Sequence, residues 1–357
     1  MDVKTLLEFM VRQNISDIHL KADSAPLIRL NGRLVASDQP PLTPDLVKEL
    51  AYSLMSEAQQ RRFEDEGELD FAYALGKISR FRVNVYKQKN TLALSLRVIP
   101  LAIKTFEELN LPALTLKKLC TMPSGLILAA GVTGAGKTTT INSMVNYINE
   151  TSASNIITIE DPIEFFHKDQ KSSISQREVG NDTRSFAAAL KYILRQDPDV
   201  IVIGEMRDPE TIAAAVTAAE TGHLVLSTIH TMDAHQTVQR IVDSYPPGQQ
   251  AQVRVSLANV LRGVVAQKLI PRMDGEGRLP CTEILVTTAY IRQLMTDGKV
   301  SDLVVAMSRG QNEGMLTFDQ DLIRLTREGK ISPEIAISES SRPENLTSML
   351  QGISVKI

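Results

Sequence analysis

The chain has 357 residues, of which 43% are apolar and 23% charged, and its 39 basic and 42 acidic side chains leave a formal net charge of −3. This composition is ordinary for a folded globular protein and excludes a largely disordered chain, while the length allows about two or three domains. Because the charges nearly balance, nothing in the composition calls for nucleic acid as a partner.

Cysteine spacing and hydropathy narrow the class of protein further. Cys120 and Cys281 lie far apart, and neither has a second cysteine at C-x-x-C spacing. A structural zinc site and a disulfide framework are therefore not expected. The two isolated cysteines are consistent with a protein of the reducing cytosol. No uninterrupted apolar stretch approaches the roughly 18 residues that a membrane helix needs, and the N-terminus lacks the pattern of a signal peptide. We therefore expect any membrane association to come through a partner.

The N-terminal part of the chain predicts a small domain of mixed helices and strands. Apolar residues recur at helical spacing over 3–10, and they alternate with polar residues around 18–20 as in a strand. Asn31-Gly32 predicts the turn of a hairpin, since a type I′ turn needs positive φ at both central residues. Helices are expected over 44–55, started by a Thr-Pro cap, and over 56–66, ended by a glycine.

Two further strands of this domain, 80–85 and 91–98, each alternate apolar and polar residues. A hairpin turning at Lys89-Asn90 has a register that places Arg82 opposite Arg97 on the polar face. Like charges directly opposite each other are unfavourable unless an anion lies over them. Two interpretations stay open: a pair of solvated surface arginines, or a clamp for a phosphate that this domain does not itself bind.

A linker is expected between this domain and the next. Residues 100–112 have no sustained periodicity and carry a proline at each end. A short helix over 114–120 is expected to follow. The apolar run over 126–130 then predicts a buried strand.

A P-loop follows this strand and opens a helix over 139–149. The segment G-V-T-G-A-G-K-T has the spacing G-x-x-x-x-G-K-T, in which successive backbone N–H groups wrap around a polyphosphate. Lys137 is expected to reach the β and γ phosphates, and Thr138 to offer its hydroxyl to Mg²⁺. The alternative is a merely glycine-rich turn. The candidate nucleotide-binding residues are Gly131, Val132, Thr133, Gly134, Ala135, Gly136, Lys137, Thr138 and Thr139.

The remainder of the chain alternates strands with helices, one of them capped by Thr183, which predicts a parallel sheet covered on both faces. The strand over 156–159 is followed by the carboxylates Glu160, Asp161 and Glu164. In open α/β sheets ligands bind at the carboxyl ends of the strands, so this cluster should lie near the P-loop. The alternative is a solvated acidic turn.

Two more strands end in residues that suit phosphate chemistry. One apolar strand ends at Glu205, which fits the Walker B carboxylate that reaches Mg²⁺, usually through water. The next ends at His230, on the same edge of the predicted sheet. A lone histidine is more often structural, and His19, His167 and His235 are expected to be surface or structural residues, but the position of His230 suits a sensor of the γ-phosphate.

The C-terminal third offers no second cluster of catalytic side chains. A helix is expected over 249–264, followed by a strand near 267–270. Short helical segments are then expected over 290–296, 301–309, 318–327 and 334–338. This arrangement favours a motor over an enzyme that acts on small molecules.

The order of these motifs is specific enough to identify a family. After the P-loop come I-E-D-P-I-E at 159–164, Q-R-E-V-G at 176–180, I-G-E-M-R-D at 203–208, A-E-T-G-H at 219–223 and S-T-I-H-T at 227–231. Together they resemble the type II/IV secretion ATPases, and most closely the type IV pilus retraction ATPases of the PilT kind. The resemblance covers nearly the whole chain. It implies an α/β fold in which a small α+β PAS-like domain (1–99) and a linker (100–112) precede a RecA-like P-loop ATPase core (113–357).

The resemblance also implies a function and partners. It implies a cytoplasmic ATPase that forms a homo-hexamer and couples ATP hydrolysis, with Mg²⁺, to pilus retraction and twitching motility. The partner implied is an integral platform protein at the cytoplasmic face of the inner membrane. In such a ring the N-terminal domain of one subunit leans on the ATPase core of the next, so Arg82 and Arg97 resemble fingers offered to a neighbouring γ-phosphate.

Catalytic roles carry over residue by residue. By resemblance Glu164 is the general base that activates water, and Glu205 is the carboxylate linked to Mg²⁺. The chemistry of the two residues would also allow these roles to be exchanged. Lys137 and His230 complete the set of catalytic residues that the resemblance implies.

Alternative functions stay open. Residues 289–296, A-Y-I-R-Q-L-M-T, depart from the A-I-R-N-L-I-R-E-like segment of retraction ATPases, although Arg292 matches. This leaves room for an accessory retraction ATPase of the PilU kind. A pilus assembly or type II secretion ATPase fits less well, because many carry an extra N-terminal domain and a four-cysteine zinc site. A nucleic-acid translocase is disfavoured because the chain has no Trp, only 4% aromatic residues and no sustained basic tract.

Overall fold

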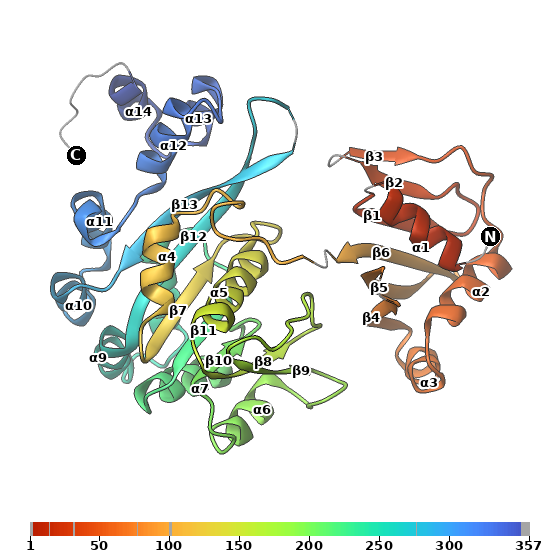
Figure 1. The fold of residues 1–357 in the computed structure, drawn as a ribbon, viewed down its shortest axis with the longest axis horizontal. Helices are drawn as coiled ribbons and strands as arrows, with labels where there is room; N and C mark the ends of the chain where they lie inside the picture. The colour runs from red at the N-terminus through yellow and green to blue at the C-terminus, as the bar shows by residue number, and fades with distance from the viewer. Residues whose placement is uncertain are drawn as a thin grey trace. The chain divides into compact units, whose positions relative to one another are not determined.

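The computed structural model describes residues 3–13, 15–30, 33–76, 78–99, 102–275 and 277–350 (Figure 1). The chain divides into two compact units. The first unit is Met1–Ala102 with Pro162–Phe166, and the second unit is Ile103–Asp161 with His167–Ile357. Each unit has its own sheet and its own apolar core. Within the described ranges, none of the helices has the length and apolar character needed to cross a membrane.

The first unit is built on a six-stranded antiparallel sheet with the order β3-β2-β1-β6-β5-β4. The strands are β1 (Asp17–Lys21), β2 (Leu27–Leu30), β3 (Arg33–Ala36), β4 (Glu68–Leu75), β5 (Ser79–Gln88) and β6 (Thr91–Ile99). The helices are α1 (Val3–Arg12), α2 (Pro44–Leu54) and α3 (Glu57–Glu66). Buried residues of all three helices pack with alternate residues of the sheet into one core, which explains the amphipathic patterns in the sequence.

Local signals set the ends of these elements. The Thr43 side chain accepts from the Leu46 amide to start α2, and Gly67 ends α3 in the left-handed region at φ 80°. The predicted turn at Lys89-Asn90 is confirmed, with φ of 45° and 60°. The expected hairpin of β2 and β3 is also present, although its Asn31-Gly32 turn lies outside the described residues.

The second unit contains a seven-stranded sheet with the order β13-β12-β7-β11-β10-β8-β9. Its strands are β7 (Gly125–Ala130), β8 (Asn155–Glu160), β9 (Ser173–Glu178), β10 (Val200–Ile203), β11 (Leu224–Ile229), β12 (Leu261–Pro271) and β13 (Arg278–Val286). All neighbours pair in parallel except β12 and β13, which form an antiparallel ribbon. Every residue of β7, β10 and β11 is buried, as expected for central strands covered on both faces.

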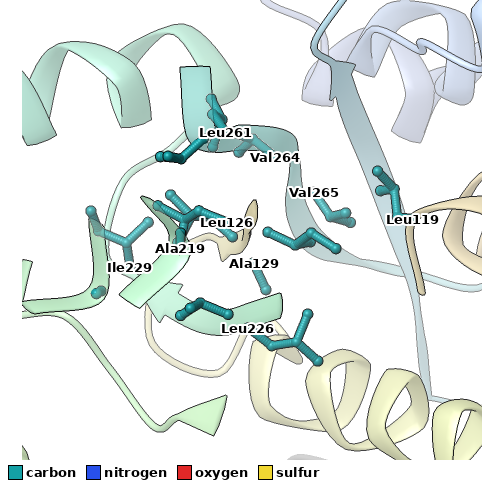
Figure 2. Packing of buried hydrophobic residues seen from close by; sticks show 14 of the residues in the cluster. Leu119, Leu126, Ala129, Ala219, Leu226, Ile229, Leu261, Val264 and Val265 are labelled. Carbon is teal, nitrogen blue, oxygen red and sulfur yellow. The ribbon is translucent and has the colours of Figure 1, made fainter. Parts of the chain in front are cut away.

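Helices cover this sheet and continue beyond it. They are α4 (Ala113–Cys120), α5 (Lys137–Thr151), α6 (Phe186–Ile193), α7 (Pro209–Glu220), α8 (Ala234–Asp243), α9 (Gln250–Val260), α10 (Ala289–Thr296), α11 (Leu303–Arg309), α12 (Phe318–Arg327), α13 (Pro333–Glu339) and α14 (Pro343–Leu350). Figure 2 shows the core around β7, where side chains of β7, β11 and β12 pack with Leu119 of α4 and Ala219 of α7. The predicted parallel sheet is therefore confirmed.

Several boundaries differ from the prediction, and two of them have a clear local reason. Thr183 does not cap α6; the helix begins at Phe186, and the Ser185 side chain accepts from the Ala188 amide. The Thr183 carbonyl instead accepts from the Gly180 amide at 2.7 Å, in the turn after β9. The helix expected to reach residue 264 ends at Val260, because the chain becomes extended at Leu261 and pairs with β7 as β12.

Candidate nucleotide site

The P-loop joins the end of β7 to the start of α5 in a shape that needs glycine. Gly131, Gly134 and Gly136 have φ of 151°, 78° and 89°. A Cβ atom on Gly131 would lie 2.6 Å from the Gln267 carbonyl oxygen, and one on Gly136 would lie 2.7 Å from Gln267 Nε2. Gly136 stands at the N-terminus of α5, where backbone N–H groups are free to bind phosphate.

Lys137 lies inside the loop and is only 7% exposed. Its Nζ donates to the carbonyl oxygens of Gly131 at 2.8 Å and Val132 at 3.0 Å, and it lies 3.5 Å from His230 Nδ1. A buried ammonium group held at the start of a helix is a strong attractor for an anion. The contact also places His230 beside the P-loop, as the order of the strands predicted.

Glu205 and His230 meet because β10 and β11 are neighbours. Glu205 Oε2 lies 3.4 Å from His230 Nε2, and Glu205 Oε1 lies 2.6 Å from an Arg207 guanidinium nitrogen. The hydroxyl of Thr228 donates to the Gly204 carbonyl at 2.7 Å, which fixes the end of β11 against the end of β10. Lys137, His230 and Glu205 thus form a continuous row across the ends of β7, β11 and β10.

The acidic cluster after β8 is divided between the two units. Glu160 ends β8 in the second unit, is 7% exposed, and accepts from Thr158 Oγ1 at 2.8 Å and Gln176 Nε2 at 3.0 Å. Glu164 lies in the segment grouped with the first unit, where its Oε1 is 3.9 Å from Arg82 Nη1. The Arg80 guanidinium lies over the Phe166 ring of the same segment, 3.7 Å from its centroid. The role of Glu164 as general base stays a prediction.

Arg82 and Arg97 pair directly across β5 and β6, as the register predicted. Each also has a carboxylate from the adjoining strand. Arg82 Nη2 lies 2.5 Å from Asp70 Oδ2 on β4, and Arg97 Nε donates to Asp17 Oδ1 on β1 at 2.7 Å. The sequence left open which anion offsets the two like charges, and these carboxylates do so within the chain. The side chain of Arg97 nevertheless remains 64% exposed.

Gln267 is a site residue that the sequence analysis missed. It lies on β12, is 3% exposed, and its Nε2 donates to the Ala135 carbonyl at 2.5 Å while its Oε1 accepts from Thr140 Oγ1 at 2.7 Å. Together with its close contacts to two glycines, these bonds fix the shape of the P-loop from the side of the sheet. The polar pair Gln267-Lys268, which interrupts the apolar run V-V-A-Q-K-L-I, was the available signal.

His167 is structural, as expected for it. Its Nε2 lies 2.7 Å from Asn142 Oδ1 on α5, and the Asn142 amide group donates to the Thr138 carbonyl at 2.9 Å. Burial lowers the pKa of His167 to about 4, so the ring is neutral near pH 7. A neutral ring with a fixed partner steadies the first turn of the P-loop helix without adding charge to it.

Comparison with known proteins agrees with this geometry. The model of the family described as type II/IV secretion system protein matches residues 1–313. The type IV pilus retraction ATPase PilT of Pseudomonas aeruginosa is 42% identical over 345 residues, which cover 97% of this chain and 100% of that protein. The type IV pilus ATPase PilU of the same organism is 40% identical over 372 residues, which cover 100% and 97%.

Solved structures give the same picture. A crystal structure of the pilus retraction motor PilT with bound ADP has a TM-score of 0.89 and 43% identity, and the match covers 98% of this chain and 100% of that one. The ATPase DotB of Legionella pneumophila has a TM-score of 0.79 at 27% identity, with 93% of each chain covered. This chain therefore belongs to the type II/IV secretion system protein family, and within it to the P-loop ATPases of the type IV pilus retraction kind.

Proposed function

We propose that this chain is a motor that couples ATP hydrolysis to retraction of a type IV pilus. The observation that carries the proposal is the row of Lys137, His230 and Glu205 beside a glycine-shaped P-loop, in a chain that is 42% identical to a retraction ATPase over 97% of its length.

The residues of the second unit would bind and orient the triphosphate. The amides of the loop and of the first turn of α5 hold phosphate oxygens, and the Lys137 ammonium offsets their charge. His230 lies between Lys137 and Glu205, where it can contact the γ-phosphate and report its presence. Glu164 takes the proton of the attacking water as general base, the role that the resemblance assigns to it.

The donor set fits Mg²⁺. Hydroxyl and carboxylate oxygens are the ligands this ion prefers, and Thr138 in the first turn of α5 and Glu205 after β10 supply one of each. Thr138 would bind it directly and Glu205 through water. The ion would neutralise charge on the β and γ phosphates.

Completion of the site requires a second copy of the chain. We infer a homo-hexameric ring in which Arg82 and Arg97 of one subunit stabilise the γ-phosphate bound by the next. The exposure of Arg97 and the pairing of the two arginines on one sheet face support this role. The proposed domains are the PAS-like domain over 1–99, the linker over 100–112 and the RecA-like core over 113–357. The ring would act in the cytoplasm on an integral platform protein of the inner membrane.

An accessory retraction ATPase is the second candidate. The identities to PilT and PilU, 42% and 40%, differ by too little to separate them. Residues 289–296 on α10 depart from the segment expected of retraction ATPases.

Deletion of the gene in its host, with surface pili counted and their shortening followed by microscopy, tests the proposal. A retraction motor predicts abundant pili that no longer shorten, rescued by the wild-type gene and not by Lys137→Ala. Pili that still shorten at reduced frequency would indicate the accessory role. Loss of pili would mean an assembly ATPase, and an unchanged phenotype would overturn the proposal.

A further inference from the structure

Glu283 on β13 is a buried carboxylate that serves the first residues of two helices. It is 5% exposed, and its Oε1 accepts from the Ala234 amide, the first residue of α8, at 2.9 Å. The amide of Phe318, the first residue of α12, also donates to it. Amides at a helix start have no partner within the helix, and a negative charge there is favoured by the helix dipole. One side chain therefore anchors both helices to the β12–β13 ribbon.

Ala234, the residue of α8 that is bonded to Glu283, lies four residues after His230 in the sequence. Between them, Thr231 Oγ1 lies 2.6 Å from Thr237 Oγ1, and the Thr237 hydroxyl donates to the Asp233 carbonyl at 2.7 Å. The segment that leaves His230 is thus joined to the first turns of α8. The first residue of α8, Ala234, is in turn bonded to Glu283.

Charged groups face Glu283 from each element around it. Asp233 and His235 come from α8, Lys268 from β12, Asp319 from α12 and Glu339 from α13, and Arg342 follows α13; all line one cavity with Glu283. Lys268 Nζ is paired with Glu339 Oε2 at 2.9 Å, and Asp319 Oδ1 accepts from the Ser340 hydroxyl at 2.7 Å. Burial, with smaller contributions from Asp233 and Asp319, raises the pKa of Glu283 to about 7, against the two donating amides.

We propose that Glu283 is a positioning residue for ATP hydrolysis: by holding the start of α8, it keeps His230 in place between Lys137 and Glu205. The inference deepens the proposed function, because it rests on the role of His230 in that site. The ionised carboxylate has an acceptor oxygen for each of the two amides. A protonated carboxyl or a glutamine has one acceptor fewer, so α8 and the His230 segment lose part of their restraint.

A double-mutant cycle with Glu283→Gln and His230→Gln tests the proposal, with turnover measured at enzyme concentrations high enough to follow the slow variants. Glu283→Gln should lower kcat about 10-fold or more with KM changed by less than about twofold, because it displaces a catalytic group without removing a phosphate contact. In the His230→Gln background the same substitution should lower kcat by less than about twofold. Equal losses in both backgrounds would overturn the proposal.

The pH dependence of kcat gives a second readout. The wild-type kcat should fall as the pH is lowered through about 7, where Glu283 gains a proton, and Glu283→Gln should flatten this part of the profile. A profile that keeps its shape in Glu283→Gln would contradict the proposal.

Asp321→Asn is the matched control for a purely structural effect. Asp321 is also buried, but it accepts from Thr282 and Arg324, which belong to β13 and α12. This substitution should lower the thermal midpoint and leave kcat within about twofold of wild type. A loss of kcat equal to that of Glu283→Gln would mean that both residues affect turnover only by maintaining the fold, and it would overturn the proposal. If His230→Gln itself turned over at the wild-type rate, the role assigned to His230 in the proposed function would be wrong. This outcome distinguishes a failure of the proposed function from a failure of the role of Glu283.

Discussion

The P-loop edge of the second unit was predicted from a motif and the arginine pair of the first unit from a hairpin register, and the two differ in how complete they are within one chain. Lys137 is 7% exposed, contacts His230, and lies in a loop whose shape Gln267 fixes. Arg97 is 64% exposed and paired with Asp17 of its own sheet. Groups that bind phosphate within a chain can be buried and held in advance, whereas a group offered to another chain must stay accessible.

The arginine side of this comparison predicts the largest effect. Arg97→Ala should lower ATP turnover of an assembled ring by about 10³- to 10⁵-fold, the range measured for arginine fingers, and leave nucleotide affinity largely intact. Steady-state turnover and binding of a fluorescent ADP analogue, both at concentrations where the ring is assembled, check the two halves of this statement.

The chain offers a matched control for Arg97. Arg29 also approaches Asp17, at 3.8 Å, from the other neighbouring strand. Arg29→Ala therefore removes another ion pair from the same carboxylate and should leave turnover within about twofold, since Arg29 does not belong to the arginine pair of β5 and β6. Wild-type turnover by an assembled ring of Arg97→Ala would refute the finger assignment.

Lys137→Ala tests the P-loop edge of the second unit, which binds phosphate within the chain. Removal of the ammonium that faces the phosphates should lower kcat about 10²- to 10³-fold and, unlike Arg97→Ala, also weaken nucleotide binding. Exposed Lys171 gives the control, because Lys171→Ala should leave both quantities unchanged. Unaltered binding by Lys137→Ala, measured by calorimetry, would argue against the contact with phosphate.

Gln267→Ala tests whether the sheet shapes the P-loop. The substitution leaves the buried Ala135 carbonyl and Thr140 hydroxyl without this partner, which costs about 1–3 kcal/mol. We expect the Kd for nucleotide to rise about 10-fold, as that cost falls on the loop. Thr140→Val removes one of the two bonds and should produce a smaller rise. Equal affinity in all three proteins would show that the loop keeps its shape without Gln267.

The last prediction concerns the dependence of stability on pH rather than activity. Burial raises the pKa of Glu283 from 4.5 to about 7, so the folded protein binds a proton more tightly than the unfolded chain in this interval. Its stabilising contribution is complete below 4.5 and is lost as the pH rises through about 7. The free energy of unfolding of wild type, relative to Glu283→Gln, should therefore fall by about 3 kcal/mol across this window.

Urea denaturation at several pH values checks this prediction. Exposed Glu313 on the surface supplies the comparison, because Glu313→Gln should show no such change over the window. A constant difference between wild type and Glu283→Gln would contradict a raised pKa.

Elements that depend on local sequence were predictable. The register of β5 and β6 followed from the turn at Lys89-Asn90, where both residues have positive φ. The start of α2 followed from Thr43-Pro44. The placement of Glu205 and His230 followed from the rule that parallel strands present their carboxyl ends on one edge, which needs no detail of packing.

Features that depend on distant pairing were not predictable. Gln267 reaches the P-loop because β12 pairs with β7, more than a hundred residues earlier in the chain. Glu283 anchors α8 only because β13 in turn pairs with β12. The carboxylates opposite the arginines come from β1 and β4, whose places beside β6 and β5 no local pattern specifies. Glu160 and Glu164 belong to different units, which the continuous acidic motif also did not predict.

Subunit mixing tests most directly the claim that the two half-sites act across chains. Lys137→Ala chains keep the arginines, and Arg97→Ala chains keep the P-loop, so each ring alone should be inactive. Rings assembled from an equal mixture should regain turnover at roughly a quarter of their sites, where an intact P-loop meets an intact arginine. A mixture of Lys137→Ala chains with chains that carry both substitutions should stay inactive. Absence of recovery in the first mixture, with mixed rings verified by mass, would contradict the account.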